Sequence, residues 1–336
     1  IKNMSKILVT GGAGYVGSKL TLDLAEKNHE VIIYDTCYFG KEHITENENI
    51  KLVEGDIRDK AKFEKAVNGC DMVIHLACIS NDPSFDLNEE LSKSINFDCF
   101  EDLVTISKKN GVKKFVYASS SSVYGFSDDP NVTEEHPLVP LTLYNKFKGM
   151  CEPVLKKHLD EKFRGVIIRP ATVCGYAPHC RLDLSVNILT NHAVNNKKII
   201  VLGGGEQKRP NLHVNDMSRV YLMLEENDFK EINGETFNVS FENKKIIELA
   251  KIVASNVKSF FNYDNVEIEV KTETVDNRSY HVNSDKIKRV LNFEPNYNID
   301  DAVKSLCEAF KDGKLPNSLT DPKYINVTTL KNLDAV

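Results

Sequence analysis

The sequence predicts an α/β protein, a doubly wound parallel sheet followed by a smaller C-terminal α/β domain. Three observations predict this fold class. Short, continuously apolar runs alternate with helical patterns through the first half, which indicates strands buried on both faces of a sheet. A glycine-rich segment lies between the first apolar run and the first helical stretch. After Pro170 the alternation gives way to loops rich in Gly, Pro and His.

Six apolar runs are the expected strands of the sheet. They are residues 6–10, 31–34, 51–54, 72–77, 114–118 and 165–170. Helical patterns follow the first strand from about Gly17 to Lys27, and two longer ones cover residues 87–109 and 142–160. Pro153 interrupts the last of these, at a cost of ~3 kcal/mol unless a kink accommodates it.

Composition and charge exclude several classes of function. The 336 residues are 41% hydrophobic and carry a net charge of -6, which is ordinary for a soluble protein and argues against a nucleic-acid surface or a basic membrane patch. We find no apolar run of membrane-span length and no signal segment, so a cytoplasmic location is expected. The cysteines and histidines lack C-x-x-C and H-x-x-x-H spacings, so we expect neither a disulfide framework nor a metal.

The segment 10–17 (TGGAGYVG) has the features of a dinucleotide-binding loop. Its glycines let the backbone turn tightly and approach a pyrophosphate, and the following helix offers free N–H groups to the phosphates. Asp35 ends the next strand, eighteen residues after Gly17. A carboxylate there binds both ribose hydroxyls and repels a 2′-phosphate. The sequence therefore predicts a Rossmann domain that binds NAD in preference to NADP.

Tyr144 and Lys148 are four residues apart in an expected helix, so they share one helical face. The ammonium is then expected beside the phenol, where it favours phenolate. Lys148 and an oxidised nicotinamide would together lower the tyrosine pKa from its ordinary value near ~10 in a desolvated pocket. With Ser120, from the run SSSSVYG at 119–125, the pair is predicted to provide the base for a hydride transfer.

The change after Pro170 sets the expected domain boundary. We predict that residues 1–175 form the NAD-binding domain, with return segments from about 206–240. Residues 176–336 would mainly form a substrate-binding domain. The polar tail from about Leu315 has weak periodicity, so it is either a surface strap or frayed.

Taken together, these pieces resemble the extended short-chain dehydrogenase/reductase family, in its nucleotide-sugar epimerase/dehydratase branch. In the family's order, from about residue 4 to 310, the matching pieces are segment 10–17, Asp35, Gly55-Asp56-Ile57, His75-Leu76-Ala77, Asn96, segment 119–125, Tyr144, Lys148, Arg169-Pro170, Arg209 and His213-Val214. The resemblance implies that Asp56 holds the adenine and that Ser120 hydrogen-bonds the reacting sugar oxygen. It also assigns the proton and cofactor work to Tyr144 and Lys148.

The resemblance implies the residues that contact each ligand. The expected cofactor contacts are Gly11, Gly14, Tyr15, Val16, Asp35, Asp56, Ile57, Leu76, Ala77, Tyr144 and Lys148. The expected contacts of a nucleotide-diphosphate sugar are Ser120, Ser121, Arg181, Asn187, Arg209 and Arg278. The family's dimers imply a homodimer through the helices at 87–109 and 142–160. Segments 79–83, 181–187 and 276–280 resemble enzymes associated with bacterial surface-polysaccharide sugars.

The residues beside Ser120 bear on the reaction. A 4,6-dehydratase of this family carries Thr-Asp-Glu before Val-Tyr-Gly, whereas this chain has Ser120-Ser121-Ser122. Losing the acid and the base, worth about 10²–10⁴-fold, disfavours dehydration. A 3,5-epimerase would usually have cysteine in place of Ser121. A 4-epimerase needs only the Ser-Tyr-Lys trio and is the preferred hypothesis. A 4-dehydrogenase or 4-keto reductase fits the same residues, and a non-catalytic NAD-binding sensor would typically lose the tyrosine or lysine.

Four more residues carry weaker predictions. Cys174 stands where the family often has tyrosine, so it is expected near the nicotinamide and the sugar, more as a small packing residue than as an acid or base. His75 is expected to pack at a strand end under the cofactor. His179 and Cys180 are candidates for sugar contacts.

Overall fold

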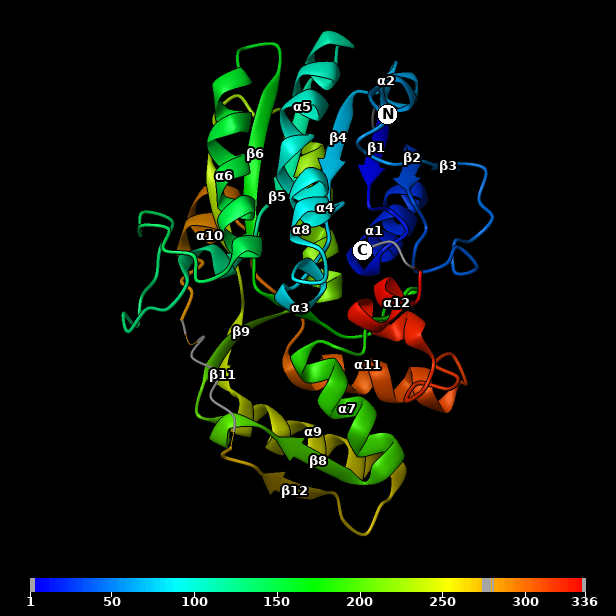
Figure 1. Ribbon diagram of the computed structural model, residues 1–336, viewed down its shortest axis with the longest axis vertical. Helices are drawn as coiled ribbons and strands as arrows, with labels where there is room; N and C mark the ends of the chain where they lie inside the picture. Colours follow the sequence, from blue (N-terminus) through cyan, green and yellow to red (C-terminus); the bar gives the residue numbers. More distant parts are fainter. Residues whose placement is uncertain (1–3, 274–278, 280, 334–336) are drawn as a thin grey trace.

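A computed structural model describes residues 4–273, 279 and 281–333. Its centre is a seven-stranded sheet in the order β10-β6-β5-β4-β1-β2-β3, and every pair of neighbours is parallel. Helices cover both faces of the sheet (Figure 1). The predicted doubly wound Rossmann fold is confirmed.

The six predicted strands are present with ends shifted by no more than two residues. They are β1 (Lys6–Thr10), β2 (Glu30–Asp35), β3 (Ile50–Glu54), β4 (Met72–His75), β5 (Lys114–Ala118) and β6 (Arg164–Pro170). The seventh, β10 (Thr236–Val239), pairs with β6 at the sheet edge. Ile7, Leu8 and Val9 of β1 are all fully buried, as expected for a strand covered on both sides.

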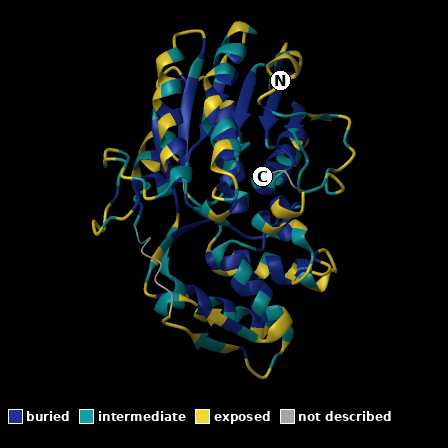
Figure 2. Cartoon of the chain, in the orientation of Figure 1, coloured by how far each residue is buried: buried dark blue, intermediate teal, exposed yellow. Residues whose placement is uncertain are grey.

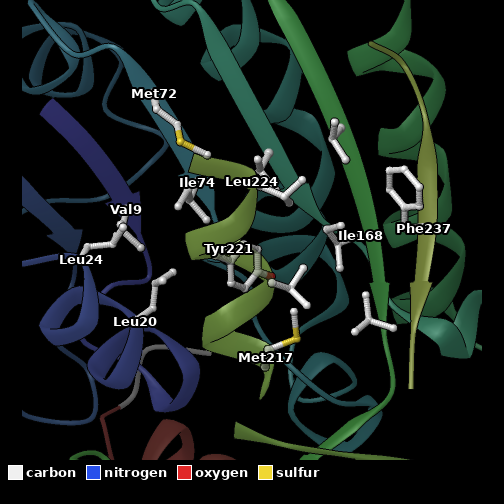
Figure 3. Packing of buried hydrophobic residues seen from close by; sticks show 14 of the residues in the cluster. Val9, Leu20, Leu24, Met72, Ile74, Ile168, Met217, Tyr221, Leu224 and Phe237 are labelled. Atoms are coloured by element: carbon white, nitrogen blue, oxygen red, sulfur yellow. The ribbon is translucent and has the colours of Figure 1, made fainter. Parts of the chain in front are cut away.

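Two separate cores hold helices on the two faces. On one face lie α1 (Tyr15–Glu26), α8 (Val214–Glu226) and α10 (Asp285–Leu291), whose buried residues include Leu20, Tyr221 and Leu224 (Figure 3). On the other lie α2 (Lys60–Val67), α5 (Phe100–Lys109) and α6 (Leu143–His158). The strands between them are buried, while the outer helix surfaces are exposed (Figure 2).

The single helix predicted along 87–109 is instead divided into three pieces. These are α4 (Glu89–Lys93), a π-helical turn (Ser94–Asp98) and α5. Asn96 within the π-helical turn accepts a hydrogen bond from the Ile79 N–H (2.8 Å) and donates one to the Ile79 carbonyl oxygen (2.9 Å). The helix widens where this side chain fastens the loop after β4. In contrast, the helix predicted at 142–160 is one element, α6, which continues through Pro153.

The remaining elements lie beyond the carboxyl ends of the sheet strands (Figure 1). Helices α7 (Ser185–Asn196), α9 (Ile246–Phe261) and α11 (Ile299–Lys311) share a third core. A three-stranded sheet contains β7 (Thr172–Cys174), β9 (Lys208–His213) and β11 (Glu242–Lys245), and β8 (Lys198–Val201) pairs with β12 (Glu267–Val270). A domain boundary near residue 175, with return segments at 206–240, remains our interpretation of this arrangement.

The short elements lie mainly at loops and in the tail. They are α3 (Asp82–Phe85), η2 (Ser121–Tyr124), η3 (Gly203–Gly205), η4 (Pro322–Tyr324) and α12 (Asn326–Asn332). The tail is therefore folded over its described length, with Tyr324 and Leu330 buried. Within the described part of the chain, no helix combines the length and apolar character that crossing a membrane requires.

Candidate active site

A cavity of about 750 Å³ lies where the strands of the large sheet end. Its wall is formed by segments that follow β1, β2, β3, β4 and β5 and by residues after β6. Most of the predicted site residues meet on its wall: Gly11, Gly14, Tyr15, Val16, Asp35, Asp56, Ile57, Leu76, Ala77, Ser120, Ser121, Tyr144, Arg181 and Arg209. Ligand sites of open α/β sheets occur at this edge.

The glycine-rich loop packs closely against the end of β4. A Cβ atom on Gly11 would lie 2.7 Å from the Ala77 nitrogen, and Gly11 has a φ of +70°, which disfavours other residues. A Cβ atom on Gly17 would lie 2.3 Å from the Gly11 carbonyl oxygen. Helix α1 begins at Tyr15 with Gly14 as its N-cap, so the first turn has no side-chain cap. Its backbone N–H groups are thus free for an anion.

Replacing Gly17 with Ala is expected to push α1 away from this loop. The clash involves backbone atoms, which cannot rotate aside, so we expect a loss of about 1–3 kcal/mol in unfolding free energy and weaker dinucleotide binding. Gly149→Ala in α6 is the control, because its added Cβ would meet only the Leu138 side chain at 3.3 Å and Val123 side-chain atoms beyond 3.7 Å. Denaturant titration and dinucleotide binding measure both. Equal behaviour of the two variants would contradict this account of the loop.

Two carboxylates lie where the dinucleotide's adenosine is expected. Asp35 accepts hydrogen bonds from the N–H groups of Cys37 (2.8 Å) and Ala13 (3.0 Å). Burial raises the pKa of Asp35, and these two N–H groups partly offset that effect. Burial also raises the pKa of Asp56, but its hydrogen bonds to Arg58 outweigh burial and leave the pKa below its usual value. Both side chains line the cavity as acceptors.

Tyr144 lines the cavity, whereas Lys148 is buried behind the wall. Lys148 is 5% exposed, and its Nζ donates to the Ala118 carbonyl oxygen at 2.6 Å. An ammonium has two further N–H donors, and no hydrogen bond joins it to the Tyr144 hydroxyl among the described residues, so its place beside the phenol stays a prediction. Burial raises the pKa of Tyr144 well above its usual value, and Arg181 is the cation that opposes this rise.

Two of the serines on the cavity wall, Ser120 and Ser122, form a chain of hydroxyls that ends on Asn145. Ser120 Oγ lies 2.6 Å from Ser122 Oγ, which donates to Asn145 Oδ1 at 2.5 Å. Because the Ser122 proton points to Asn145, Ser120 is the donor in the first of these bonds. Ser120 also accepts from the Ser122 N–H at 3.2 Å. A ligand oxygen could therefore receive the Ser120 proton in place of Ser122.

A buried ion pair holds this segment in place. Arg169 donates to both carboxylate oxygens of Glu152, at 2.9 and 2.6 Å, and the two residues are 6% and 4% exposed. Ser119 Oγ donates to the same carboxylate at 2.7 Å, and Arg169 also donates to the Tyr124 hydroxyl at 2.7 Å. The pair thus ties both ends of the serine segment to α6 and β6.

The predicted substrate contacts divide into three groups. Arg181 and Arg209 line the cavity. Asn187 is fully buried and does not reach the wall, because its amide binds the Gly175 N–H, the Tyr15 hydroxyl and the Arg181 carbonyl oxygen. Arg278 lies outside the described residues.

The weaker predictions also have mixed outcomes. Cys174 is 1% exposed with its thiol directed to the Leu212 carbonyl oxygen, so it packs in the core and does not face the cavity. His75 packs on Phe100 and Tyr117 beneath the wall, and burial lowers its pKa to about 3. His179 lines the cavity, whereas Cys180 is buried behind it.

The wall also contains residues that were missed as site residues, and four of them contact or influence predicted ones. Cys78 and Asp82 both act to raise the pKa of Tyr144. Ser80 binds Arg181, and Asn326 comes from the tail. Asp82 and Ser80 lie in segment 79–83, whose resemblance to related enzymes was a usable signal. The sequence contains no comparable signal for Asn326.

Comparison with known proteins identifies the family. The model of the NAD dependent epimerase/dehydratase family matches residues 7–240. The chain belongs to this family. Its cofactor is accordingly NAD, and the tight glycine loop, the uncapped first turn of α1 and the Asp35 carboxylate fit that dinucleotide. The resemblance seen in the sequence is confirmed.

Relatives in the family catalyse different reactions. The chain is 27% identical to a UDP-N-acetyl-alpha-D-glucosaminuronate decarboxylase of Bacillus cytotoxicus, over 91% of this chain and 98% of the relative. It is 32% identical to a putative UDP-glucose 4-epimerase of Methanocaldococcus jannaschii, over 65% and 72%. The structure of a UDP-glucose 4-epimerase from Thermotoga maritima, with UDP-glucose, superposes with a TM-score of 0.79 at 25% identity, over 91% and 99%.

Proposed function

We propose that the protein is an NAD-dependent nucleotide-sugar 4-epimerase that works through a transient 4-keto intermediate. The observation that carries this proposal is the hydroxyl chain of Ser120 and Ser122, with Ser121 beside it on the cavity wall. Dehydration at C5 and C6 needs a carboxyl acid and a base at these positions, whereas inversion at C4 needs proton transfer at one hydroxyl alone. Asp82, a carboxylate near Tyr144, is engaged with the Thr142 hydroxyl at 2.6 Å.

The chain's residues divide the work as follows. Bound NAD supplies a hydride acceptor and donor for C4. Tyr144 is the proposed base that takes the proton from the C4 hydroxyl and later returns it. The Ser120 hydroxyl, which donates to Ser122 in the structure, is proposed to turn and donate its hydrogen bond to the same C4 oxygen. The loop around Gly11 and the Asp35 carboxylate hold the dinucleotide, and Arg209 binds the diphosphate.

A panel of UDP-, GDP-, CDP- and dTDP-sugars in D₂O, followed by NMR, tests the reaction. We expect inversion at C4 with no deuterium on carbon. Deuterium at C3 or C5 would assign enolisation chemistry and contradict the proposal. So would an accumulated 4-keto sugar with stoichiometric NADH, which indicates a dehydrogenase, or loss of CO₂ from a uronate.

The charges around Tyr144 predict how the pH profile responds to substitution. The base must be ionised, so kcat/KM falls as pH drops through the Tyr144 pKa in the free enzyme. Asp82→Asn removes a charge that raises this pKa, so the acid limb is expected to move to lower pH. Arg181→Met is expected to move it to higher pH. Asp86→Asn, on an exposed residue at the end of α3, is the control and leaves the limb in place. An acid limb at the wild-type pH in both Asp82→Asn and Arg181→Met would show that Tyr144 is not the titrating base.

We further propose a homodimer through the helices at 87–109 and 142–160. α5 and α6 pack side by side on one face of the sheet, and Met150 of α6 is 37% exposed. Light scattering should give twice the mass of the chain, and a monomer at assay concentration would contradict the assignment.

We propose a cytoplasmic setting in bacterial surface-polysaccharide synthesis on the resemblance of segments 79–83 and 181–187.

A further inference from the structure

The C-terminal segment 321–332, called the strap below, packs into two different cores beside the cavity. Leu330 of α12 is 1% exposed and shares the sheet's core with Phe39, from the loop after β2. Tyr324 of η4 is 3% exposed and shares a core with Tyr15 of α1. Figure 1 shows α12 below the carboxyl ends of β1 and β2, between the sheet and α11. The strap is thus anchored beside the part of the cavity where the dinucleotide is expected.

Asn326 is the residue of the strap that reaches the cavity wall. It is 4% exposed, its backbone N–H donates to Asp183 Oδ2 at 3.0 Å, and its Nδ2 donates to Ser80 Oγ at 2.8 Å. Ser80 follows β4, and its hydroxyl also accepts from Arg181 Nη1 at 3.0 Å. Asn326 therefore joins the strap to the loop after β4 and to the Arg181–Asp183 ion pair.

The Asn326 side chain has an acceptor that the protein does not use. Its Oδ1 is buried and has no hydrogen-bond partner among the residues that the structure describes. A buried acceptor without a donor is destabilising, and native proteins satisfy nearly all of them with protein, water or ligand. The ribose hydroxyls and the carboxamide of NAD are donors of the required kind.

We propose that Asn326 is a cofactor-binding residue and that the strap retains NAD in the cavity. The dinucleotide is favoured over the sugar nucleotide as the ligand because Ser80, which accepts from the Asn326 amide, follows β4 of the NAD-binding sheet, and Leu330 packs in the core of that sheet. Of the residues predicted for the sugar nucleotide, Arg209 comes from β9, whereas Arg181 shares the Ser80 hydroxyl with Asn326, so UDP binding is measured beside NAD release. The proposal does not depend on which reaction the protein catalyses.

The rate at which NAD leaves the protein tests this proposal. Full-length protein is loaded with NAD and freed of excess, and released NAD is destroyed with an NAD glycohydrolase while bound NAD is measured over time. Asn326→Ala is expected to release NAD about tenfold faster, the effect of one buried hydrogen bond. The matched control is Asn332→Ala, on an exposed residue of the same helix, which should release NAD at the wild-type rate.

The alternatives are separated by two further measurements. Thermal unfolding shows whether each variant is folded. Ser80→Ala removes the hydroxyl that accepts from the Asn326 amide and is expected to speed NAD release. It is the test variant if Asn326→Ala does not fold. Wild-type NAD release from a folded Asn326→Ala protein would overturn the proposal. Wild-type NAD release together with weaker UDP binding would also overturn it and would assign the amide to the sugar nucleotide.

Discussion

Tyr144→Phe is expected to lower kcat by about 10³-fold or more while NAD remains bound. The substitution removes the hydroxyl that is proposed to take the C4 proton, and general base catalysis contributes about 10²–10⁴-fold. The ring itself is retained, so its packing with Phe85, at 6.3 Å between centroids, should survive. Steady-state kinetics and the NAD content of the purified variant measure the two parts of the prediction.

A matched tyrosine makes this result interpretable. Tyr176→Phe changes a partly buried tyrosine off the cavity wall, so kcat should stay near that of the wild type. Undiminished turnover by Tyr144→Phe would eliminate Tyr144 as the base. Loss of bound NAD from the same variant would show that the phenol mainly holds the cofactor.

Positive charge is needed to make Tyr144 an effective base. Burial raises its pKa well above the usual value, and the Lys148 ammonium is bound to the Ala118 carbonyl oxygen. In the structure, Arg181 is the cation that lowers this pKa, and an oxidised nicotinamide would add to its effect. The proposed base therefore depends on a cation from beyond β6 as well as on its own helix.

Glu152→Gln is expected to lower the free energy of unfolding by about 3–5 kcal/mol, the cost of leaving one member of a buried ion pair without its counter-charge. Arg169 is 6% exposed, so water cannot replace the lost carboxylate. Ser119 would lose its charged acceptor as well, which loosens the segment that contains Ser120. We therefore expect a lower kcat together with the lower stability. Denaturant titration followed by kinetics at low temperature separates these effects.

The control is an acidic residue in an exposed ion pair. Glu101 binds Lys157 at 2.7 Å on the surface of α5 and α6, where solvent screens the interaction. Glu101→Gln should leave the unfolding midpoint unchanged. An unchanged unfolding midpoint and kcat in Glu152→Gln would show that the buried ion pair does not hold the serine segment in place.

Local patterns in the sequence were sufficient to predict the sheet and the cofactor loop. Continuous apolar runs mark strands covered on both faces, and β1 confirms this with Ile7, Leu8 and Val9 fully buried. The glycines of segment 10–17 and the Asp35 carboxylate belong to one strand–helix–strand unit, so their spacing alone places them together. Ser120 follows the end of a predicted strand and Tyr144 lies at the start of a predicted helix, so the sequence also predicted the elements that carry these two residues.

The features that escaped prediction depend on contacts between distant segments. The helix at 87–109 widens because Asn96 binds Ile79, and Asn187 is withdrawn from the cavity because Tyr15 and Gly175 bind its amide. Asn326 reaches the wall only because the tail folds back over the sheet. None of these pairings is visible in residue type or local spacing.

The most direct test of the proposed 4-epimerase uses a nucleotide sugar that carries deuterium on C4. In an epimerase of this kind, the hydrogen removed from C4 is the hydrogen returned to it. Incubated in ordinary water with the substrate identified from the panel, the protein should give product that is inverted at C4 and retains the C4 deuterium, by NMR and mass spectrometry. An inverted product with ordinary hydrogen at C4, or a 4-keto product without its label, would contradict the account.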